Sequence, residues 1–318
     1  PGLLEVLRRD LAMDIDAGRF GQGLQRRVLS RFRYLDGVNL TPIKSLLVIA
    51  VPRPAHLISL ETPCGREHTV RLPPTYIGIR ATARATLDAA LSGPLSGASG
   101  AVLAEIPLKA VAVRLGLAAY GRNNVCYVPG LGSYHQLVAI LTDAPVQGLT
   151  ARLGPVHAAA GCDGCGACME RCPTGAITGD RFPIDAERCL SRLNERPGVW
   201  PDWLPPEAHN CLFGCLACQE NCPQNAGLLS YEDTGVRLDV AETAAILARS
   251  EAEATPSLDP NEGSPANGSP DEEAWQAAVS KLGAIGLDHC RAVLGRNLRA
   301  LLGLEVAVCG DYQSPSAQ

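Results

Sequence analysis

Two cysteine-rich stretches in the middle of the chain share one pattern. The first reads CDGCGACMERCP (residues 162–173) and the second reads CLACQENCP (residues 215–223). In the first stretch, three cysteines recur at every third position, and a fourth follows four residues later with a proline directly after it. The second stretch repeats the last part of this pattern, proline included. This repeat predicts two similar metal centres held by thiolates.

The spacing is typical of proteins that bind two 4Fe–4S clusters, in which three cysteines of one run bind one cluster and the fourth binds the other. The first cluster is therefore predicted to be bound by Cys162, Cys165, Cys168 and Cys222. The second is predicted to be bound by Cys172, Cys215, Cys218 and one further cysteine, either Cys189 or Cys211. The regular interval would place this last ligand at position 212, where Leu212 stands.

Zinc and a disulfide framework are the alternatives for so many cysteines. A zinc site needs only two close pairs of cysteines, so the third cysteine of the first run would have no role. The fourth cysteine and its proline would also go unexplained. The pattern therefore favours iron–sulfur clusters.

Length and composition limit what these clusters can serve. A chain of 318 residues that is 46% hydrophobic buries a large core and is expected to divide into two or three domains. The net charge of -5 argues against a broad nucleic-acid-binding surface. No apolar run is long enough to span a membrane and no export signal is recognised, so we expect a protein of the reducing cytoplasm with no membrane partner.

The first half of the chain predicts an α/β domain. Apolar residues at Leu3, Leu4, Leu7 and Leu11 share one face of a helix that runs to about Ala17. Residues 45–52 form an apolar run that suits a strand covered on both faces. Further helices are predicted over residues 76–91 and 107–116, and further strands over residues 125–128 and 136–141.

Small residues mark two loops of this domain. Gly121 lies in one, and Gly130, Gly132 and Ser133 lie in the other. Their small side chains allow a large, flat ligand to approach the backbone closely. The alternative is that these residues only form turns between strands.

Four short motifs outside the cysteine stretches resemble those of epoxyqueuosine reductases and the related reductive dehalogenases. They are IPLKAVAVRLGL (residues 106–117), GRNN (121–124), GS (132–133) and LTD (141–143). The similarity covers roughly residues 40–230, with a weaker echo in VLGRNL (293–298). In that family the cysteine matching Cys189 is the single ligand between the two cluster motifs, so the resemblance favours Cys189 over Cys211.

The resemblance implies a nitroreductase-like α/β core that binds cobalamin in its base-off form beside a bacterial ferredoxin-like double-cluster module. Electrons would pass through the clusters to form cob(I)alamin, which would reduce a small organic substrate. A ferredoxin or flavodoxin would be the electron donor. The alternative is a low-potential electron-transfer or corrinoid-activating iron–sulfur protein without substrate chemistry of its own; a binding protein with structural clusters is a third possibility.

The chain departs from the family at one functional segment. Epoxyqueuosine reductases carry an Asp-Ser-Ala-Pro segment whose aspartate is the proton donor, whereas residues 100–105 read GAVLAE and contain no aspartate. Helical repeats that handle tRNA are also shortened. We therefore expect no tRNA partner, and the missing export signal argues against reductive dehalogenation.

The resemblance also suggests candidate site residues. Those expected to hold the corrin are Gly121, Arg122, Asn123, Asn124, Gly130, Gly132 and Ser133. The candidate proton donors are Tyr134, Glu105 and His135, followed by Tyr120. A glutamic acid or tyrosine in a dry cleft keeps its proton because desolvation disfavours the charged form.

These observations predict three consecutive domains. Residues 1–150 would form the α/β cobalamin-binding domain, residues 151–230 the double-cluster module and residues 231–310 a helical C-terminal segment. Within the last, residues 240–250 and 275–302 are expected to be helical and to pack on the core. Residues 251–273 are rich in Pro, Ser, Gly and acidic residues, a composition that predicts a disordered acidic loop.

Overall fold

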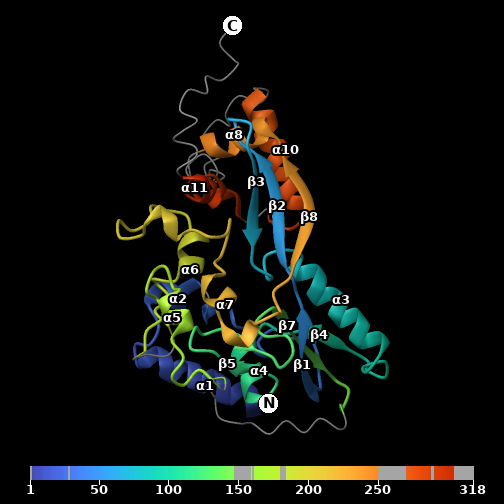
Figure 1. The fold of residues 1–318 in the computed structure, drawn as a ribbon. Coiled ribbons are helices and arrows are strands. Elements are labelled where there is room, and N and C mark those ends of the chain that lie inside the picture. Colours follow the sequence, from blue (N-terminus) through green and yellow to red (C-terminus); the bar gives the residue numbers. More distant parts are fainter. Residues whose placement is uncertain are drawn as a thin grey trace, which may run out of the picture. The chain divides into compact units, whose positions relative to one another are not determined.

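The computed structural model describes residues 2–27, 29–146, 159, 161–179, 184–249, 270–287 and 290–303. The chain forms two compact units, each assembled from separate stretches of sequence (Figure 1). Within the described residues, unit 1 draws on residues 2–53, 78–189 and 217–229, and unit 2 on residues 54–77, 190–216 and 230–303. The three consecutive domains expected from the sequence stay a prediction.

Unit 1 begins with three short helical elements. They are α1 (Gly2–Asp16), α2 (Gln22–Arg27) and the 3₁₀ helix η1 (Leu29–Arg31). Helix α1 buries Leu4 and Leu7, which lie on the apolar face that the sequence predicted. These two leucines join a core that includes Tyr34 and Leu141.

The centre of unit 1 is an antiparallel sheet of three strands in the order β1–β7–β4. These strands are β1 (Ser45–Pro52), β7 (His135–Thr142) and β4 (Ala101–Leu103). Alternate side chains of β1 enter different cores: Leu46 packs with Val111 of α4 (Leu108–Arg114), and Leu47 packs with Leu87 of α3 (Ile79–Ser92). The prediction of a strand covered on both faces is confirmed.

A small hairpin and three short helices complete unit 1. The hairpin pairs β5 (Ala119–Tyr120) with β6 (Cys126–Tyr127), so the predicted strand 125–128 is only two residues long. The helices belong to the two cysteine stretches and are α5 (Ala167–Glu170), α7 (Ala217–Glu220) and the 3₁₀ helix η3 (Pro223–Asn225). Helices α5 and α7 contact each other, which brings the two stretches together.

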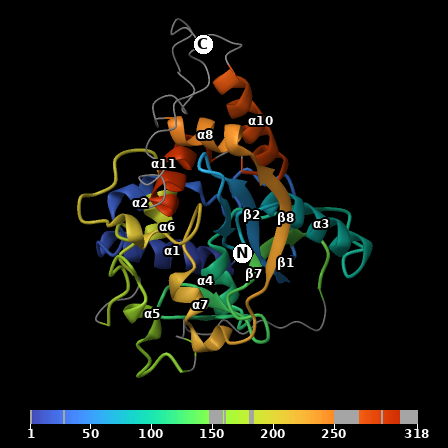
Figure 2. The ribbon, with the colours of Figure 1, turned by 45° about the horizontal axis from the view of Figure 1, so that its top comes forward.

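Unit 2 contains a second sheet in the order β3–β2–β8, which the sequence analysis did not predict. Strand β2 (Ala55–Glu61) is antiparallel to β3 (Glu67–Leu72) and parallel to β8 (Tyr231–Leu238). Helices α8 (Val240–Ala248) and α10 (Pro270–Ala284) pack on this sheet (Figure 2). The remaining helical elements are α11 (Arg291–Leu302), α6 (Leu190–Asn194) and the 3₁₀ helix η2 (Pro206–Ala208). The core includes Ile58, Leu72, Ile246 and Leu294.

Two expectations for the C-terminal segment need correction. The single helix predicted over residues 275–302 is divided, because Gly286 has a φ of 88°, which an α-helix does not accommodate. Residues 270–273, expected in a disordered loop, form the first turn of α10, where Asp271, Glu272 and Glu273 suit the positive end of the helix dipole. Residues 250–269 lie outside the described residues.

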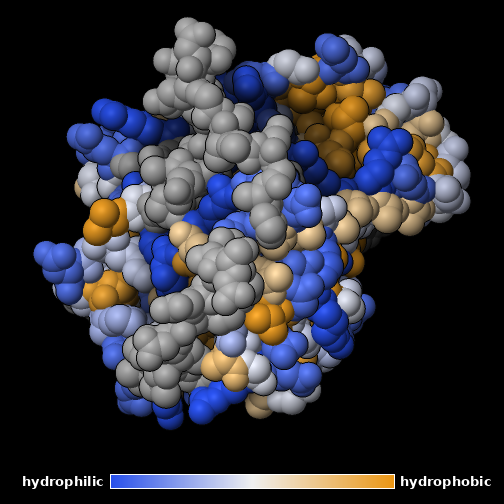
Figure 3. Space-filling model, turned by 90° about the horizontal axis from the view of Figure 1, so that it is seen from above, coloured by the Kyte–Doolittle hydropathy of each residue, from blue (hydrophilic) through white to orange (hydrophobic). Residues whose placement is uncertain are grey.

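The predicted mixed α/β fold class is confirmed by both units. On the face shown in Figure 3, hydrophobic residues form patches that hydrophilic residues separate. None of the helices in the described part of the chain is long and apolar enough to cross a membrane.

Candidate iron–sulfur centre

Unit 1 brings together the four thiols predicted for the first cluster. Cys168 lies in α5, and Cys222 directly precedes η3. Burial raises the pKa of the Cys168 thiol, and the neighbouring thiols of Cys222, Cys162 and Cys165 raise it further. Cys168 therefore has both Cys222 of the other stretch and two cysteines of its own stretch as neighbours, as a ligand that crosses between the stretches requires.

These four thiols fit an iron–sulfur cluster better than a single ion. All four cysteines are partly exposed, so their sulfurs are accessible to a bound group. Among the described residues, no three Cys, His, Asp or Glu side chains converge closely enough to hold one metal ion. Zinc requires four donors about 2.0–2.3 Å from one centre, whereas a cubane is a larger body with a thiolate at each iron.

Three predicted ligands of the second cluster also lie in unit 1. The Sγ of Cys172 accepts a hydrogen bond from the backbone N–H of Ala176 at 3.3 Å. Cys218 lies within α7, and Cys189 is partly exposed. The ammonium of Lys109 interacts electrostatically with Cys189 and donates to the Asn124 carbonyl at 2.9 Å. Hydrogen bonds and positive charge near sulfur both stabilise a thiolate.

Cys215 and its competitor Cys211 lie in unit 2 and share a partner. The amide nitrogen of Asn210 donates to the Cys215 Sγ at 3.2 Å, and the Cys211 thiol donates to the Asn210 Oδ1 at 3.3 Å. Cys211 is fully buried, whereas Cys215 and Cys189 are partly exposed. The sulfur of Cys211 is therefore less accessible than those of Cys189 and Cys215.

Two buried asparagines fix the segment of unit 2 that carries Cys215. The side chain of Asn194 exchanges two hydrogen bonds with the backbone of Gly214, at 2.7 and 2.9 Å. The amide of Asn297, on α11, donates to the carbonyls of Asn194 at 2.6 Å and Leu212 at 2.9 Å. Both asparagines are 0% exposed, so these bonds are made in the core, where an unpaired polar group is costly.

Arg296 strengthens the same attachment. Its guanidinium lies 4.4 Å from the ring centroid of Trp200 and donates to the Arg196 carbonyl at 2.8 Å. Trp200 stacks on His209, and burial together with the positive charge of Arg296 lowers the pKa of His209 to about 4. His209 is therefore neutral at physiological pH, and the stack adds no charge beside Arg296.

The GRNN turn contacts the cluster-binding segments through its side chains. Arg122 donates to the Gly179 carbonyl at 3.2 Å. The Asn123 amide donates to the Tyr127 hydroxyl at 2.9 Å and is 3.4 Å from the Cys218 carbonyl. The side chains expected to hold corrin amides therefore donate hydrogen bonds within unit 1.

The loop over residues 130–135 packs in the same way. Asn225 of η3 accepts from the Ser133 N–H and donates to the Ser133 Oγ, both at 2.8 Å. A Cβ added at Gly132 would lie 2.2 Å from the Asn225 Oδ1, whereas one added at Gly130 would meet nothing within 4 Å. The small residues of this loop thus admit a close neighbour, but that neighbour is the side chain of Asn225, just after the second cysteine stretch.

The candidate proton donors occupy different environments. Tyr134 and His135 are buried, and burial lowers the pKa of His135 although its hydrogen bond to the Gly132 carbonyl raises it. Burial raises the pKa of Tyr120. Glu105 has a side chain 71% exposed and forms an ion pair with Arg33 at 3.8 Å, which is the environment of a surface charge.

One titratable pair of unit 2 was missed by the sequence analysis. The hydroxyl of Tyr76 donates a hydrogen bond to the carboxyl group of Glu195. Desolvation raises the pKa of Glu195, although the residue keeps an exposed surface. A Cβ added at Gly214 would lie 2.5 Å from the Tyr76 hydroxyl, so Tyr76 also lies against the segment that carries Cys215. Sequence spacing gave no signal, because Tyr76 and Glu195 are far apart in the chain.

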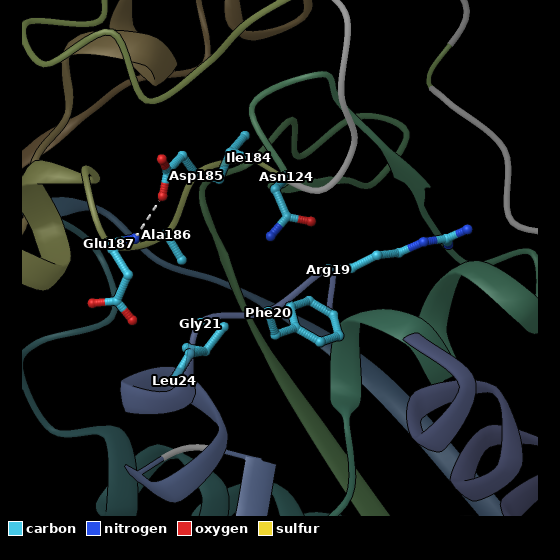
Figure 4. A pocket seen from close by; sticks show the side chains of 9 residues that line it. All are labelled: Arg19, Phe20, Gly21, Leu24, Asn124, Ile184, Asp185, Ala186 and Glu187. Atoms are coloured by element: carbon cyan, nitrogen blue, oxygen red, sulfur yellow. Dashed lines mark hydrogen bonds between the residues drawn. The ribbon is translucent and has the colours of Figure 1, made fainter. Parts of the chain in front are cut away.

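Figure 4 shows a pocket of unit 1 near Asn124. It is lined by Arg19, Phe20, Gly21, Leu24, Asn124, Ile184, Asp185, Ala186 and Glu187. Its free volume of about 40 Å³ is room for a few water molecules. It does not provide space for a macrocycle.

Comparison with known protein families identifies the cysteine stretches. Residues 161–225 match the 4Fe-4S double cluster binding domain. This match includes both cysteine runs, together with Cys189 and Cys211 between them. The prediction of two 4Fe–4S clusters is therefore supported by a family model as well as by spacing.

Curated relatives confirm the resemblance seen in the motifs. The chain is 34% identical to the epoxyqueuosine reductase of Staphylococcus aureus over 39% of its own length and 31% of that protein. It is 35% identical to the Escherichia coli enzyme over 42% of its own length and 34% of that protein. The similarity thus spans about a third of the length of these oxidoreductases.

Solved structures share the fold over most of this chain. An epoxyqueuosine reductase from Streptococcus thermophilus has a TM-score of 0.60 and 19% identity, covering 94% of this chain and 74% of its own. An epoxyqueuosine reductase solved with an epoxyqueuosine-modified tRNA-Tyr stem loop has a TM-score of 0.55 and 20% identity. The match covers 97% of this chain and 88% of that protein. This relative contradicts the expectation of no tRNA partner, which was wrong.

The packing of Gly132 on Asn225 generates a first prediction. Gly132→Ala should lower the iron and sulfide content per chain after anaerobic reconstitution, because the new methyl group displaces Asn225 and with it η3 and the adjoining Cys222. Gly130→Ala is the matched control. Gly130 has a similar positive φ of 79°, against 56° for Gly132, but has open space around it. Equal iron content in the two variants would contradict this prediction.

The Asn297 bonds generate a second prediction. Asn297→Leu keeps the branched shape of the side chain but leaves two buried carbonyls without their donor, which should cost about 1–3 kcal/mol of unfolding free energy. Urea unfolding of the protein checks this value. Gln276→Ala, an exposed change on α10, should stay within about 0.5 kcal/mol of wild type. A similar small change for Asn297→Leu would show that the asparagine does not hold this segment.

Proposed function

We propose that this protein is a cobalamin-dependent oxidoreductase of the epoxyqueuosine reductase type, with two 4Fe–4S clusters that carry electrons to its reacting site. The observation that carries the proposal is that Cys168 of the first stretch has Cys222 of the second stretch as a neighbour in unit 1, together with Cys162 and Cys165. The fold shared with solved epoxyqueuosine reductases supports it.

The proposed ligand set uses eight partly exposed cysteines. The first cluster takes Cys162, Cys165, Cys168 and Cys222, and the second takes Cys172, Cys189, Cys215 and Cys218. Cys189 is preferred to Cys211 because Cys211 is fully buried and its thiol donates to Asn210. The single ligand between the two motifs of the related family supports the same choice.

Cobalamin would supply a strongly reducing metal centre at the reacting end of the electron path. The chain's similarity to the family supports its presence, but the side chains of Arg122, Asn123 and Ser133 do not fit the role predicted for them. Within unit 1 they already form hydrogen bonds to Gly179, to the Cys218 carbonyl and to Gln219, which lie in or shortly after the two cysteine stretches. Their proposed role is to hold those segments in place, and the corrin site is left to other residues.

The proposed substrate is a modified nucleoside in tRNA, in keeping with the tRNA stem loop held by a solved relative. Its reduction needs a proton donor, and the family's aspartate is missing from residues 100–105. Glu195 is the proposed candidate, because its pKa is raised and it pairs with a tyrosine, although its side chain is exposed. Tyr76 would orient it through their hydrogen bond.

Anaerobic reconstitution with and without added cobalamin tests the proposal. We expect about eight iron and eight sulfide per chain, a bound cobalamin spectrum and reduction of epoxyqueuosine in a tRNA stem loop. Clusters without bound cobalamin would favour the electron-transfer or corrinoid-activating alternative. Stoichiometric zinc in native material would contradict the proposal altogether.

Glu195 gives a pH-dependent prediction. Its raised pKa means that the folded state binds its proton more tightly than the unfolded state, so this contribution to stability is present below about pH 4.5 and is lost as pH rises through about 7. Glu195→Gln should remove that part of the pH dependence of unfolding. The kcat/KM of this variant should be much lower than that of wild type. It should also no longer fall above pH 7.

Glu105→Gln is the control for Glu195→Gln, because Glu105 is an exposed carboxylate paired with Arg33. We expect wild-type kcat/KM and an unchanged pH profile for this variant. A profile that changes with Glu105→Gln and not with Glu195→Gln would return the donor role to Glu105.

A further inference from the structure

The proline that follows the first cysteine stretch begins a turn that returns the chain to Cys172. Pro173 and Thr174 occupy the two central positions of this turn, and the Gly175 N–H donates to the Cys172 carbonyl at 3.2 Å. Proline suits the first central position because its ring fixes φ, and glycine is common directly after the second. The turn therefore directs residues 174–176 toward the Cys172 sulfur.

Two groups in this turn are hydrogen-bonded to that sulfur. The Ala176 N–H donates to the Cys172 Sγ at 3.3 Å, and the Thr174 Oγ1 is hydrogen-bonded to the same atom at 3.5 Å. Thr174 is 4% exposed, and its hydroxyl has no other hydrogen-bond partner among the described residues. A cysteine bound to iron is a thiolate without a proton. In the loaded site the threonine O–H is therefore the donor and the sulfur is the acceptor.

The segment that ends at Cys189 fixes the backbone of the same turn. The Asp185 N–H donates to the Ala176 carbonyl at 2.9 Å, and the Arg188 Nε donates to the Thr174 carbonyl at 3.1 Å. All of these residues belong to unit 1. Because the backbone of the turn is held by these bonds, loss of the threonine hydroxyl alone should leave the turn in place.

We propose that Thr174 is a positioning residue that donates an O–H···S hydrogen bond to Cys172 and raises the reduction potential of the second cluster. One electron from a low-potential protein donor reduces the cluster, and no covalent bond forms or breaks. The added negative charge spreads over the sulfurs, so an O–H group that points at sulfur stabilises the reduced cluster more than the oxidised one. This inference rests on the ligand set proposed above.

The test is a redox titration of the Thr174→Val protein, followed by electron paramagnetic resonance under anaerobic conditions. Valine keeps the branched shape and replaces the hydroxyl with a methyl group, so iron and sulfide contents should equal those of wild type. We expect the second cluster to be about tenfold harder to reduce, which for one electron is a downward shift of about 59 mV. The first cluster should keep its potential. Thr174→Ser retains the hydroxyl and should restore the wild-type potential.

Thr178→Val is the matched control. Thr178 lies four residues after Thr174, and its buried hydroxyl oxygen has no hydrogen-bond partner among the described residues. The same exchange at this position should leave both potentials unchanged. An intact Thr174→Val protein with wild-type potentials would overturn the proposal.

A second variant covers the case in which Thr174→Val does not assemble both clusters. Thr174→Ala also lacks the hydroxyl, so a downward shift of the second potential supports the proposal and an unchanged potential contradicts it. If neither variant assembles the second cluster while Thr174→Ser does, the hydroxyl acts in cluster assembly, and the proposed control of the potential is wrong.

Two cysteine variants separate failure of this inference from failure of the ligand set. Cys172→Ser and Cys218→Ser should each change the signal of the same cluster. If they change different signals, the ligand set is wrong, and the inference fails for that reason rather than because of Thr174. The potentials are measured without cobalamin or substrate, so a protein that binds both clusters and no cobalamin would contradict the proposed function and leave this test intact.

Discussion

Four cysteine thiols held close together cannot all ionise unless cations lie between them. In unit 1, burial and three neighbouring thiols raise the pKa of Cys168, which favours protonated sulfur when no cation is near. Bound iron would supply the positive charge that stabilises the thiolates, which would couple cluster binding to the local structure. The packing of Asn225 on Ser133 is one of the contacts that hold the segment with Cys222 in place within unit 1.

Individual cysteine sulfurs accept hydrogen bonds, which would stabilise the negative charge of thiolates bound to a cluster. Ala176 donates to Cys172, and Asn210 donates to Cys215. Such bonds lower the cost of adding an electron, whereas a buried cluster without them would be harder to reduce. Residues that never contact iron could thus adjust the reduction potential of a bound cluster.

The sequence predicted the elements whose chemistry is local and missed those that depend on distant partners. Cysteine spacing identified the double-cluster domain, and the apolar run of residues 45–52 identified β1. Strand β8 reads YEDTGVRL, with mostly exposed positions, and it becomes a strand only by pairing with β2. Gly121 and Gly132 correctly signalled close approach, but a pattern of small residues does not tell a cofactor from Tyr127 or Asn225.

The expectation of no tRNA partner relied partly on the net charge of the whole chain, which does not show where its basic residues lie. The net charge of -5 sums the whole chain, yet residues 251–273 hold seven of its 33 acidic residues and no Lys or Arg. The rest of the chain therefore has 28 basic and 26 acidic residues, a net charge of +2. Phosphate binding depends on where basic side chains cluster and how many counterions they release, not on the total. A slightly acidic protein can therefore present a basic surface to RNA.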